Sequence, residues 1–255
     1  GRTTLNGEGL QHQDGHSHIL SSTIPNCLSY DPTYAYEVAT IVKDGIKKMY
    51  IDQENYFYYI TTINENYTHP EMPKDCEEGI IKGMYVLSDN ESYDVRLLGS
   101  GAILREALKA KDILFKFKIK AQVWSVTSFN LLRKDGMEIE RYNQLNPSGK
   151  QKLTYVEECF SDSNVPVIAA TDYMRSYAEQ IRPYIHSSYT TLGTDGYGRS
   201  DSRQTLRDFF EVDSKSIARA AIYALYKNDK IDKNQIENYY KELGIDSNKP
   251  NPWEI

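Results

Sequence analysis

From residue 94 onward, short apolar runs alternate with segments whose apolar residues recur every three or four positions. The runs predict strands at 95–98, 122–126, 165–170 and 189–192, and the segment 172–184 has a helical pattern. Parallel strands need long crossover connections, which are usually helices. The alternation therefore predicts an α/β fold with a mainly parallel sheet and helices packed on its faces.

Cap signals predict two more helices near the end of the chain. Asp213 is placed to cap a helix that runs to about Tyr226. Asp232 and Gln235 have the spacing of a capping box for the next helix, and Gly244 is suited to end that helix.

The first part of the chain has a different pattern of predicted secondary structure. Apolar residues at helical spacing predict an amphipathic helix at 33–50, and an aromatic and β-branched run predicts a buried strand at 56–63. The segment 64–74 contains two asparagines and two prolines, which interrupt both kinds of regular structure. We place a domain boundary there and predict two units, residues 1–72 and 73–255.

Charge and hydropathy argue against two classes of partner. The chain has 30 Lys and Arg residues against 36 Asp and Glu residues, so it lacks the basic surface that binds nucleic acids. Its longest apolar run, 220–226, is far shorter than the roughly twenty residues of a bilayer span. Three widely spaced cysteines predict reduced thiols rather than a disulfide framework. We therefore expect a cytoplasmic protein that binds neither nucleic acid nor membrane.

The strongest chemical signal is the segment 7–18, which we call the histidine loop. Its residues include three of the five histidines, three glycines, Glu8 and Asp14. The glycines disfavour a helix, and histidine can donate and accept protons near neutral pH. The pattern favours a loop that presents imidazoles for catalysis, with metal binding and a merely solvated loop as alternatives.

The metal alternative rests on the spacing of His12, His16 and His18, with Asp14 between them. A catalytic zinc site needs three protein ligands and an open position. Interposed glycine does not hold these donors on one rigid face, and no later segment supplies an obvious cluster of further ligands. A metal-dependent hydrolase that uses the three histidines is therefore the second hypothesis, and the first assigns no metal ligand.

Gly99, Ser100 and Gly101 follow a predicted strand, as in dinucleotide-binding loops. However, Leu104 occupies the last glycine position of that fingerprint, and no acidic residue ends the following strand. We favour the interpretation that small residues let a helix start close to the sheet.

The segment 193–204 contains three glycines and charges of both signs directly after a predicted strand. Loops in this position often line binding clefts in open α/β sheets. We favour a structural role, because Asp201 can cap a helix that runs to Phe210, with Gln204 completing a capping box.

At the histidine loop the sequence resembles a known family. The stretches GRTTLNGEGLQHQDGHSH and TIPNCLSYDPTYAYEVA are similar to the homodimeric pyruvate dehydrogenase component of bacteria. Other stretches resemble the same family in the same order: YYITTINENY, LLGSGAIL, VWSVTSFNLLRKDG, TDYMRSYAEQIRPY and LGTDGYGRSDSRQTLRDFFEVD. The resemblance covers essentially the whole chain and indicates the thiamine-dependent, decarboxylating component rather than transketolases in general.

The resemblance implies a division of the chain. The family has three α/β domains, of which residues 1–72 would be the tail of the middle, thiamine-pyrimidine-binding domain and residues 73–255 the transketolase-like C-terminal domain. The family's diphosphate motif, Gly-Asp-Gly followed by Asn, does not occur in this sequence. The middle-domain glutamate that activates the cofactor should lie before Gly1. We therefore expect a C-terminal fragment, with the main binding motifs for thiamine diphosphate and magnesium outside it.

The resemblance also implies the chemistry. Enzymes of this family decarboxylate pyruvate and transfer the acetyl group to the lipoyl domain of the dihydrolipoamide acetyltransferase component, and the full-length enzyme is a homodimer. His12 matches the family's histidine that faces the substrate-cofactor adduct, and Glu8 matches the acid beside it. His16 and His18 are weaker candidates that could equally well order the loop. A non-catalytic assembly or regulatory role for residues 73–255 is the third hypothesis.

Overall fold

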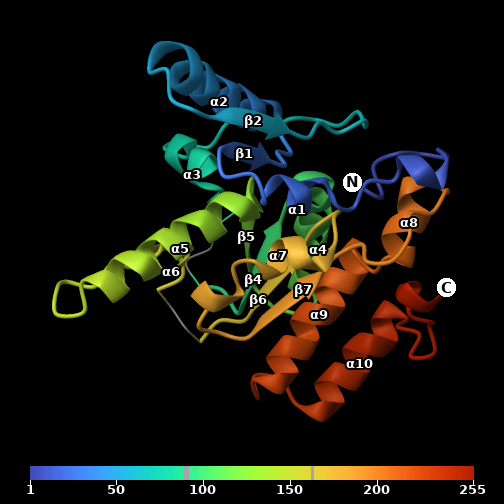
Figure 1. Cartoon of the computed structure of the whole chain (residues 1–255). Helices are drawn as coiled ribbons and strands as arrows, with labels where there is room; N and C mark the ends of the chain where they lie inside the picture. The colour runs from blue at the N-terminus through green and yellow to red at the C-terminus, as the bar shows by residue number, and fades with distance from the viewer. Residues whose placement is uncertain (89–91, 162–163) are drawn as a thin grey trace.

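The computed structural model describes residues 1–88, 92–161 and 164–255. Its main sheet has five strands in the order β3-β5-β4-β6-β7 (Figure 1). β3 is antiparallel to β5, and the other neighbours are parallel. The strands are β3 (Met84–Ser88), β4 (Val95–Gly99), β5 (Ala121–Val126), β6 (Val167–Ala170) and β7 (Tyr189–Leu192). The predicted mainly parallel sheet is confirmed, and β3 is a strand that was not among those predicted.

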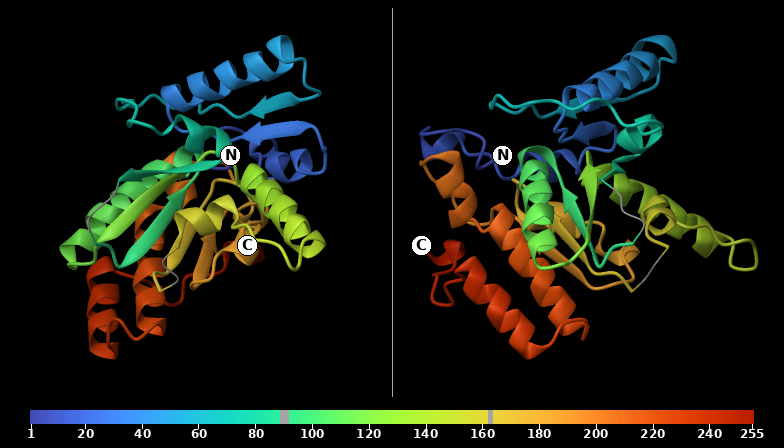
Figure 2. Two further views of the ribbon diagram at one scale, coloured as in Figure 1. Left: turned by 90° about the vertical axis from the view of Figure 1, so that its left-hand side faces the viewer. Right: turned by 180° about the vertical axis from the view of Figure 1, so that it is seen from behind.

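Helices cover both faces of this sheet (Figure 2). α4 and α9 pack against each other over one face, and α10 packs on α9, while α5, α6 and α7 lie over the opposite face. The helices are α4 (Leu104–Lys116), α5 (Phe129–Leu145), α6 (Tyr155–Cys159), α7 (Arg175–Glu179), α8 (Arg203–Phe209), α9 (Ser214–Lys227) and α10 (Lys233–Leu243). The expected α/β architecture is confirmed.

Two apolar clusters fill the space between the sheet and these helices. Leu97 and Leu98 are neighbours on β4, and both are fully buried. Leu97 belongs to the cluster under α4 and α9, and Leu98 to the cluster under α5 and α7, because successive strand residues point to opposite faces. A strand that is buried on both faces has a mostly apolar sequence rather than an alternating one, and in β4 only Arg96 departs from this pattern.

The predicted caps of the last two helices are confirmed. The carboxylate of Asp213 accepts a hydrogen bond from the amide of Ser216 at 2.9 Å. Asp232 and Gln235 form a reciprocal capping box with bonds of 2.8 and 2.9 Å. Gly244 follows α10 in the left-handed region, at φ +59°, a conformation that glycine adopts without a Cβ clash.

The predicted cap of α8 is wrong by one residue. Ser202 caps this helix, because its hydroxyl accepts from the amide of Thr205 at 3.2 Å. Asp201 lies just outside the helix, where its carbonyl accepts from the amide of Gly7 at 3.0 Å. The capping box of Asp201 with Gln204 is therefore not formed.

The continuous helix predicted at 172–184 is also wrong. α7 and a 3-10 turn (Arg182–Tyr184) replace it. The carbonyls of Asp172 and Tyr173 accept from the amides of Arg2 and Thr194, at 3.0 and 2.8 Å. They therefore do not accept the bonds of a helix that starts at 172. Pro183 is the second residue of the 3-10 turn, where its missing N–H interrupts no bond of the turn.

Residues 17–82 form a smaller unit at the top of Figure 1. Its elements are α1 (Ser17–Ser21), β1 (Cys27–Tyr30), α2 (Ala35–Ile46) with a π-helical continuation (Lys47–Ile51), β2 (Phe57–Ile60) and α3 (Glu77–Lys82). The helix predicted at 33–50 is confirmed. The strand predicted at 56–63 is confirmed in a shorter form as β2, which within the described ranges pairs with β1 alone, but its predicted burial is wrong. Phe57 on β2 is 41% exposed.

A third apolar cluster joins the two parts of the chain. It consists of Leu28, Tyr30, Ile41, Cys76, Ile80 and Tyr85. Beside it, the fully buried carboxylate of Glu37 on α2 accepts hydrogen bonds from the hydroxyls of Tyr85, at 2.7 Å, and Ser125, at 2.6 Å. The division into residues 1–72 and 73–255 stays a prediction, but the two parts share a core.

Two features concern the chain as a whole. All three cysteines are free thiols. Across the described ranges, no helix is both long and apolar enough to cross a bilayer.

Candidate active site

The histidine loop and residues 1–6 run across the carboxyl end of the main sheet and lie beside α8 (Figure 1). The amide of Arg2 donates to the carbonyl of Asp172, just after β6, and the amide of Gly7 to the carbonyl of Asp201, just before α8. Ligand sites of open α/β sheets form outside the carboxyl ends of the strands. The loop therefore lies at the edge of the sheet where this kind of fold places its chemistry.

Buried polar contacts anchor the segment before the loop. Both carboxylate oxygens of Asp172 accept from the amide of Thr3, at 3.0 and 3.2 Å. The guanidinium of Arg2 donates to the carbonyls of Thr194, at 2.6 Å, and Gly196. Burial raises the pKa of Asp172 and lowers that of Arg2. These contacts fix the backbone that leads into the loop.

A second anchor lies at the far end of the loop. The carboxylate of Asp14 accepts from the amides of His16, at 2.9 Å, and Ser17, at 3.1 Å, and from the hydroxyl of Ser17. Burial alone would raise the pKa of Asp14, but these hydrogen bonds outweigh it and lower the pKa. The carbonyl of Gly15 accepts from the amide of Met174 at 3.0 Å. Asp14 therefore stabilises a turn rather than presenting a free carboxylate.

His12 and Glu8 lie between these two anchors, and both side chains are exposed. His12 ends a short 3-10 turn (Leu10–His12), and its amide donates to the carbonyl of Gly9 at 3.0 Å. Within the part of the chain that the structure describes, neither the imidazole of His12 nor the carboxylate of Glu8 has a hydrogen-bonding partner. Both groups are therefore free to meet a molecule that approaches the loop.

His18 occupies a quite different environment. It is fully buried, and its ring stacks on Tyr177 at 4.7 Å and meets Tyr173 and Tyr59 edge-on. Its Nε2 lies 3.2 Å from the hydroxyl of Thr61. Burial lowers the pKa of His18 to about 3, so the ring is neutral at physiological pH. These contacts support a role in ordering the loop.

His16 is exposed, and its Nε2 lies 3.5 Å from the guanidinium of Arg2. The three histidines of the loop thus point into three separate surroundings. Among the residues described, no three His, Cys, Asp or Glu side chains gather into a possible metal site. The hydrolase hypothesis therefore lacks the joint ligand set of His12, His16 and His18 that it requires.

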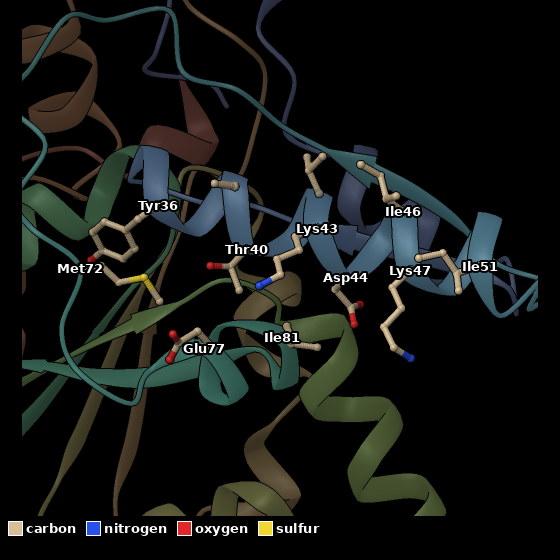
Figure 3. A pocket seen from close by; sticks show the side chains of 12 residues that line it. Tyr36, Thr40, Lys43, Asp44, Ile46, Lys47, Ile51, Met72, Glu77 and Ile81 are labelled. Atoms are coloured by element: carbon tan, nitrogen blue, oxygen red, sulfur yellow. The ribbon is translucent and has the colours of Figure 1, made fainter.

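A large cavity, of about 960 Å³, lies beside α2 (Figure 3). Most of its lining is apolar, and none of the residues that line it belongs to the histidine loop. The lining residues are Tyr36, Ala39, Thr40, Val42, Lys43, Asp44, Ile46, Lys47, Ile51, Met72, Glu77 and Ile81. Four charged side chains also line this cavity: Lys43, Asp44, Lys47 and Glu77. We place the candidate site at the loop, because the loop carries three histidines and lies at the carboxyl end of the main sheet.

Sequence reasoning missed the residues that anchor the loop. Asp172 and Arg2 carry no local motif, and their partners are far away in the sequence. One signal for Asp172 was available, because a carboxylate directly after a buried parallel strand stands at the edge where sites form. Nothing in the sequence around Arg2 indicated that its side chain would be buried.

Two family models match the chain. The model described as pyruvate dehydrogenase E1 component middle domain matches residues 1–70. The model described as transketolase-like TK C-terminal domain matches residues 83–213, just over half the chain. The chain belongs to the transketolase-like C-terminal domain family.

Curated relatives of this transketolase-like chain align over nearly its whole length. It is 56% identical over 257 residues to the pyruvate dehydrogenase E1 component of Pseudomonas aeruginosa, and 52% identical over 257 residues to that of Escherichia coli K12. Each alignment covers 99% of this chain and 29% of the relative. The chain is thus related to the C-terminal portion of bacterial pyruvate dehydrogenase E1 components and spans less than a third of their length.

Solved structures of transketolases share the fold. A transketolase mutant from Pichia stipitis matches with a TM-score of 0.64 and 19% identity, covering 88% of this chain and 29% of that one. The transketolase of Campylobacter jejuni matches with a TM-score of 0.64 and 16% identity, covering 86% and 29%. At these identities the likeness concerns the fold alone. It agrees with a middle-domain tail followed by a transketolase-like C-terminal domain.

The pyruvate dehydrogenase E1 family uses thiamine diphosphate. The residues of this transketolase-like chain do not by themselves form a binding site for the diphosphate group of this cofactor and its magnesium ion. The sequence has no Gly-Asp-Gly motif, and the described residues assemble no group of three metal-binding side chains that could hold magnesium. The histidine loop carries three exposed side chains that can titrate, those of Glu8, His12 and His16.

Proposed function

We propose that this chain is the part of a pyruvate dehydrogenase E1 component that contributes the histidine loop to the active site. The complete enzyme would decarboxylate pyruvate and transfer the acetyl group to a lipoyl group. The observation that carries this proposal is the placement of His12 and Glu8. Both are exposed on a loop that is anchored on both sides at the carboxyl end of the sheet.

In this proposal His12 exchanges a proton with the substrate-derived group, and Glu8 provides the neighbouring acid. An imidazole is suited to both directions of transfer near neutral pH. His16 remains a weaker candidate because of its position beside Arg2, and His18 acts by ordering the loop. A non-catalytic role for residues 73–255 fits less well, because this region supplies Asp172 and Asp201 to hold the histidine loop in place.

The same proposal covers cofactors and partners. Thiamine diphosphate and magnesium would be held mainly by residues outside this chain. The acetyl acceptor would be the lipoyl domain of the dihydrolipoamide acetyltransferase component, and the complete enzyme would be a cytoplasmic homodimer. Neither nucleic acid nor a membrane has a part in it.

Replacement of His12 tests the proposal. In the complete enzyme, His12→Ala should lower the turnover of pyruvate by ~10²–10⁴-fold, the usual contribution of a general acid or base. Cofactor affinity should change far less, because the side chain holds no diphosphate or metal. Steady-state kinetics and calorimetric titration with thiamine diphosphate measure the two effects.

His186→Ala is the matched control. This histidine is also exposed but lies before β7, at the opposite end of the sheet, where its Nε2 is 2.8 Å from a carboxylate oxygen of Glu157. Its replacement should leave turnover near that of the parent enzyme. Equal activity of the His12 variant and the parent would remove His12 from the reaction.

A further inference from the structure

The glycine-rich segment 193–204, for which the sequence suggested only a helix cap, packs directly against the histidine loop. Gly198 lies in tight contact with the loop. A Cβ at this position would lie 2.6 Å from the carbonyl oxygen of Leu10 and 2.5 Å from Cβ of Gln13. Real Cβ atoms essentially never come so close to a backbone oxygen. Gln13 is buried and directly follows His12. A side chain at Gly198 would therefore displace the turn that carries His12.

Arg203, at the start of α8, binds the backbone just before the loop. Its Nε donates to the carbonyl of Thr4 at 2.6 Å, and its other guanidinium nitrogen donates to the carbonyl of Asn64. Its amide donates to the side chain of Asn6 at 3.3 Å. Through these hydrogen bonds, Arg203 connects residues 1–6 both to α8 and to the connector that follows β2.

Arg207, one turn further along α8, contacts the same segment, residues 1–6. Its Nε lies 3.3 Å from the hydroxyl of Thr3, which it donates to. The guanidinium is itself fixed by Glu65, at 2.9 Å, and by Glu106, at 3.4 Å. Arg207 is only 6% exposed, so this arrangement is rigid and leaves the arginine little freedom to follow the loop.

We propose that Gly198, Arg203 and Arg207 are positioning residues that hold Glu8 and His12 in their working geometry. This inference rests on the proposed function of the loop. Between residues 7 and 12 the loop has little apolar packing of its own, since Leu10 is 55% exposed and the side chains of Glu8 and His12 are exposed. Its geometry therefore depends on the surface against which it lies. A displacement of a catalytic side chain by about 1 Å can lower the rate ~10²-fold. Small movements of the surface under the loop should therefore lower the catalytic rate.

Gly198→Ala in the complete enzyme is the first test, with Gly149→Ala as its matched control. Gly149 lies in an exposed turn after α5, where a Cβ would have ordinary contacts of 3.4 Å or more. The Gly198 variant should lose ~10²-fold in kcat, with the KM for pyruvate and the melting temperature close to those of the parent. Gly149→Ala should match the parent in all three. A Gly198→Ala enzyme with unchanged kcat, or with a loss of kcat that follows a fall in melting temperature, would contradict the proposal.

Arg203 provides an independent variant that adds no side-chain bulk. Arg203→Ala removes the bond to Thr4 and should lower kcat, while Arg203→Lys keeps one donor near the Thr4 carbonyl and should recover part of the loss. Equal loss in the two variants, or no loss in either, would count against a positioning role.

A double variant separates this inference from the proposed function. In an enzyme that carries His12→Ala, Gly198→Ala should cause little further loss of kcat, because the group that it positions is already absent. If both single variants lose activity and the losses multiply in the double variant, the positioning inference fails while the role of His12 stands. If His12→Ala alone has full activity, the proposed function fails, and the inference fails with it.

Discussion

The main sheet and the histidine loop are stabilised in opposite ways. The central strands of the sheet are buried on both faces, and two apolar clusters join them to the helices that cover those faces. Polar bonds hold the loop and its leading segment, and these bonds join residues up to 204 positions apart. The sheet would tolerate the loss of one polar contact. The exposed part of the loop before Gln13 has few other contacts with which to replace one.

The difference shows how this chain can combine a stable framework with an accessible site. Apolar burial is non-directional and roughly proportional to area, so it fixes the sheet without exposing functional groups. Hydrogen bonds to fixed backbone atoms have direction, so a few of them can hold an otherwise exposed loop. Glu8 and His12 can therefore remain open to solvent on a loop whose ends are immobile.

The largest expected effect is on the free energy of unfolding, when the same substitution, Leu→Ala, is made in the main sheet and in the histidine loop. Leu98→Ala removes a fully buried side chain from the cluster under α5 and α7, and should cost about 2–5 kcal/mol in the free energy of unfolding. Leu10→Ala makes the same chemical change at a side chain that is 55% exposed, and should cost about 0.5 kcal/mol or less. Chemical denaturation of the two variants measures both values. Equal costs would show that the loop has an apolar core of its own.

The same comparison explains which parts of the fold could be predicted from the sequence. β4, β5 and β6 have mostly apolar sequences, β7 has aromatic and β-branched residues, and α9 and α10 have local cap signals, so nearby residues suffice to predict them. β3 (Met84–Ser88) was missed although its first four residues form an apolar run, comparable with those of the strands that were predicted. The helix expected at 172–184 fails because partners far along the chain take the carbonyls of Asp172 and Tyr173.

For the candidate site, the sequence indicated the histidine loop but not the residues that hold the loop in place. The density of histidine and glycine marks residues 7–18, and the resemblance singles out His12 and Glu8. The burial of His18 among tyrosines was not predictable, because those rings come from β2 and from around α7. Gly198 shows the same limit, since the need for a glycine there depends on Leu10, which is remote in sequence.

A smaller effect is expected where the loop's leading segment meets the sheet. Asp172→Ala leaves the buried amide of Thr3 without its acceptor, and should cost about 1–3 kcal/mol. Asp172→Asn keeps one acceptor oxygen and should retain most of the stability. Hydrogen exchange of the Thr3 amide provides the local measurement. It should become much faster in the Ala variant than in the Asn variant, and equal protection in both would show that Asp172 does not anchor this segment.

The smallest effect concerns Glu65, which lies in the connector after β2. Its carboxylate forms ion pairs with arginines of α4 and α8. Its carboxylate binds Arg105, lies 2.9 Å from Arg207 and 3.9 Å from Arg203. Burial alone would raise the pKa of Glu65, but the hydrogen bonds from Arg105 and Arg207 outweigh it and lower the pKa below 4.5. The ionised form is thus favoured in the folded chain.

This shift predicts the direction of a pH dependence. Because the folded pKa lies below the unfolded one, the stabilisation by Glu65 is fully present above about pH 4.5. It is lost as the pH falls through the lower folded pKa, since the unfolded chain binds the proton first. The loss should be about 1 kcal/mol or less, as for a partly exposed ion pair. Glu65→Gln should therefore flatten the acid side of the stability curve relative to the parent. Glu237→Gln, at an exposed pair with Lys233 on α10, should leave that slope unchanged, and equal slopes in all three proteins would show that Glu65 contributes nothing to the arginine support.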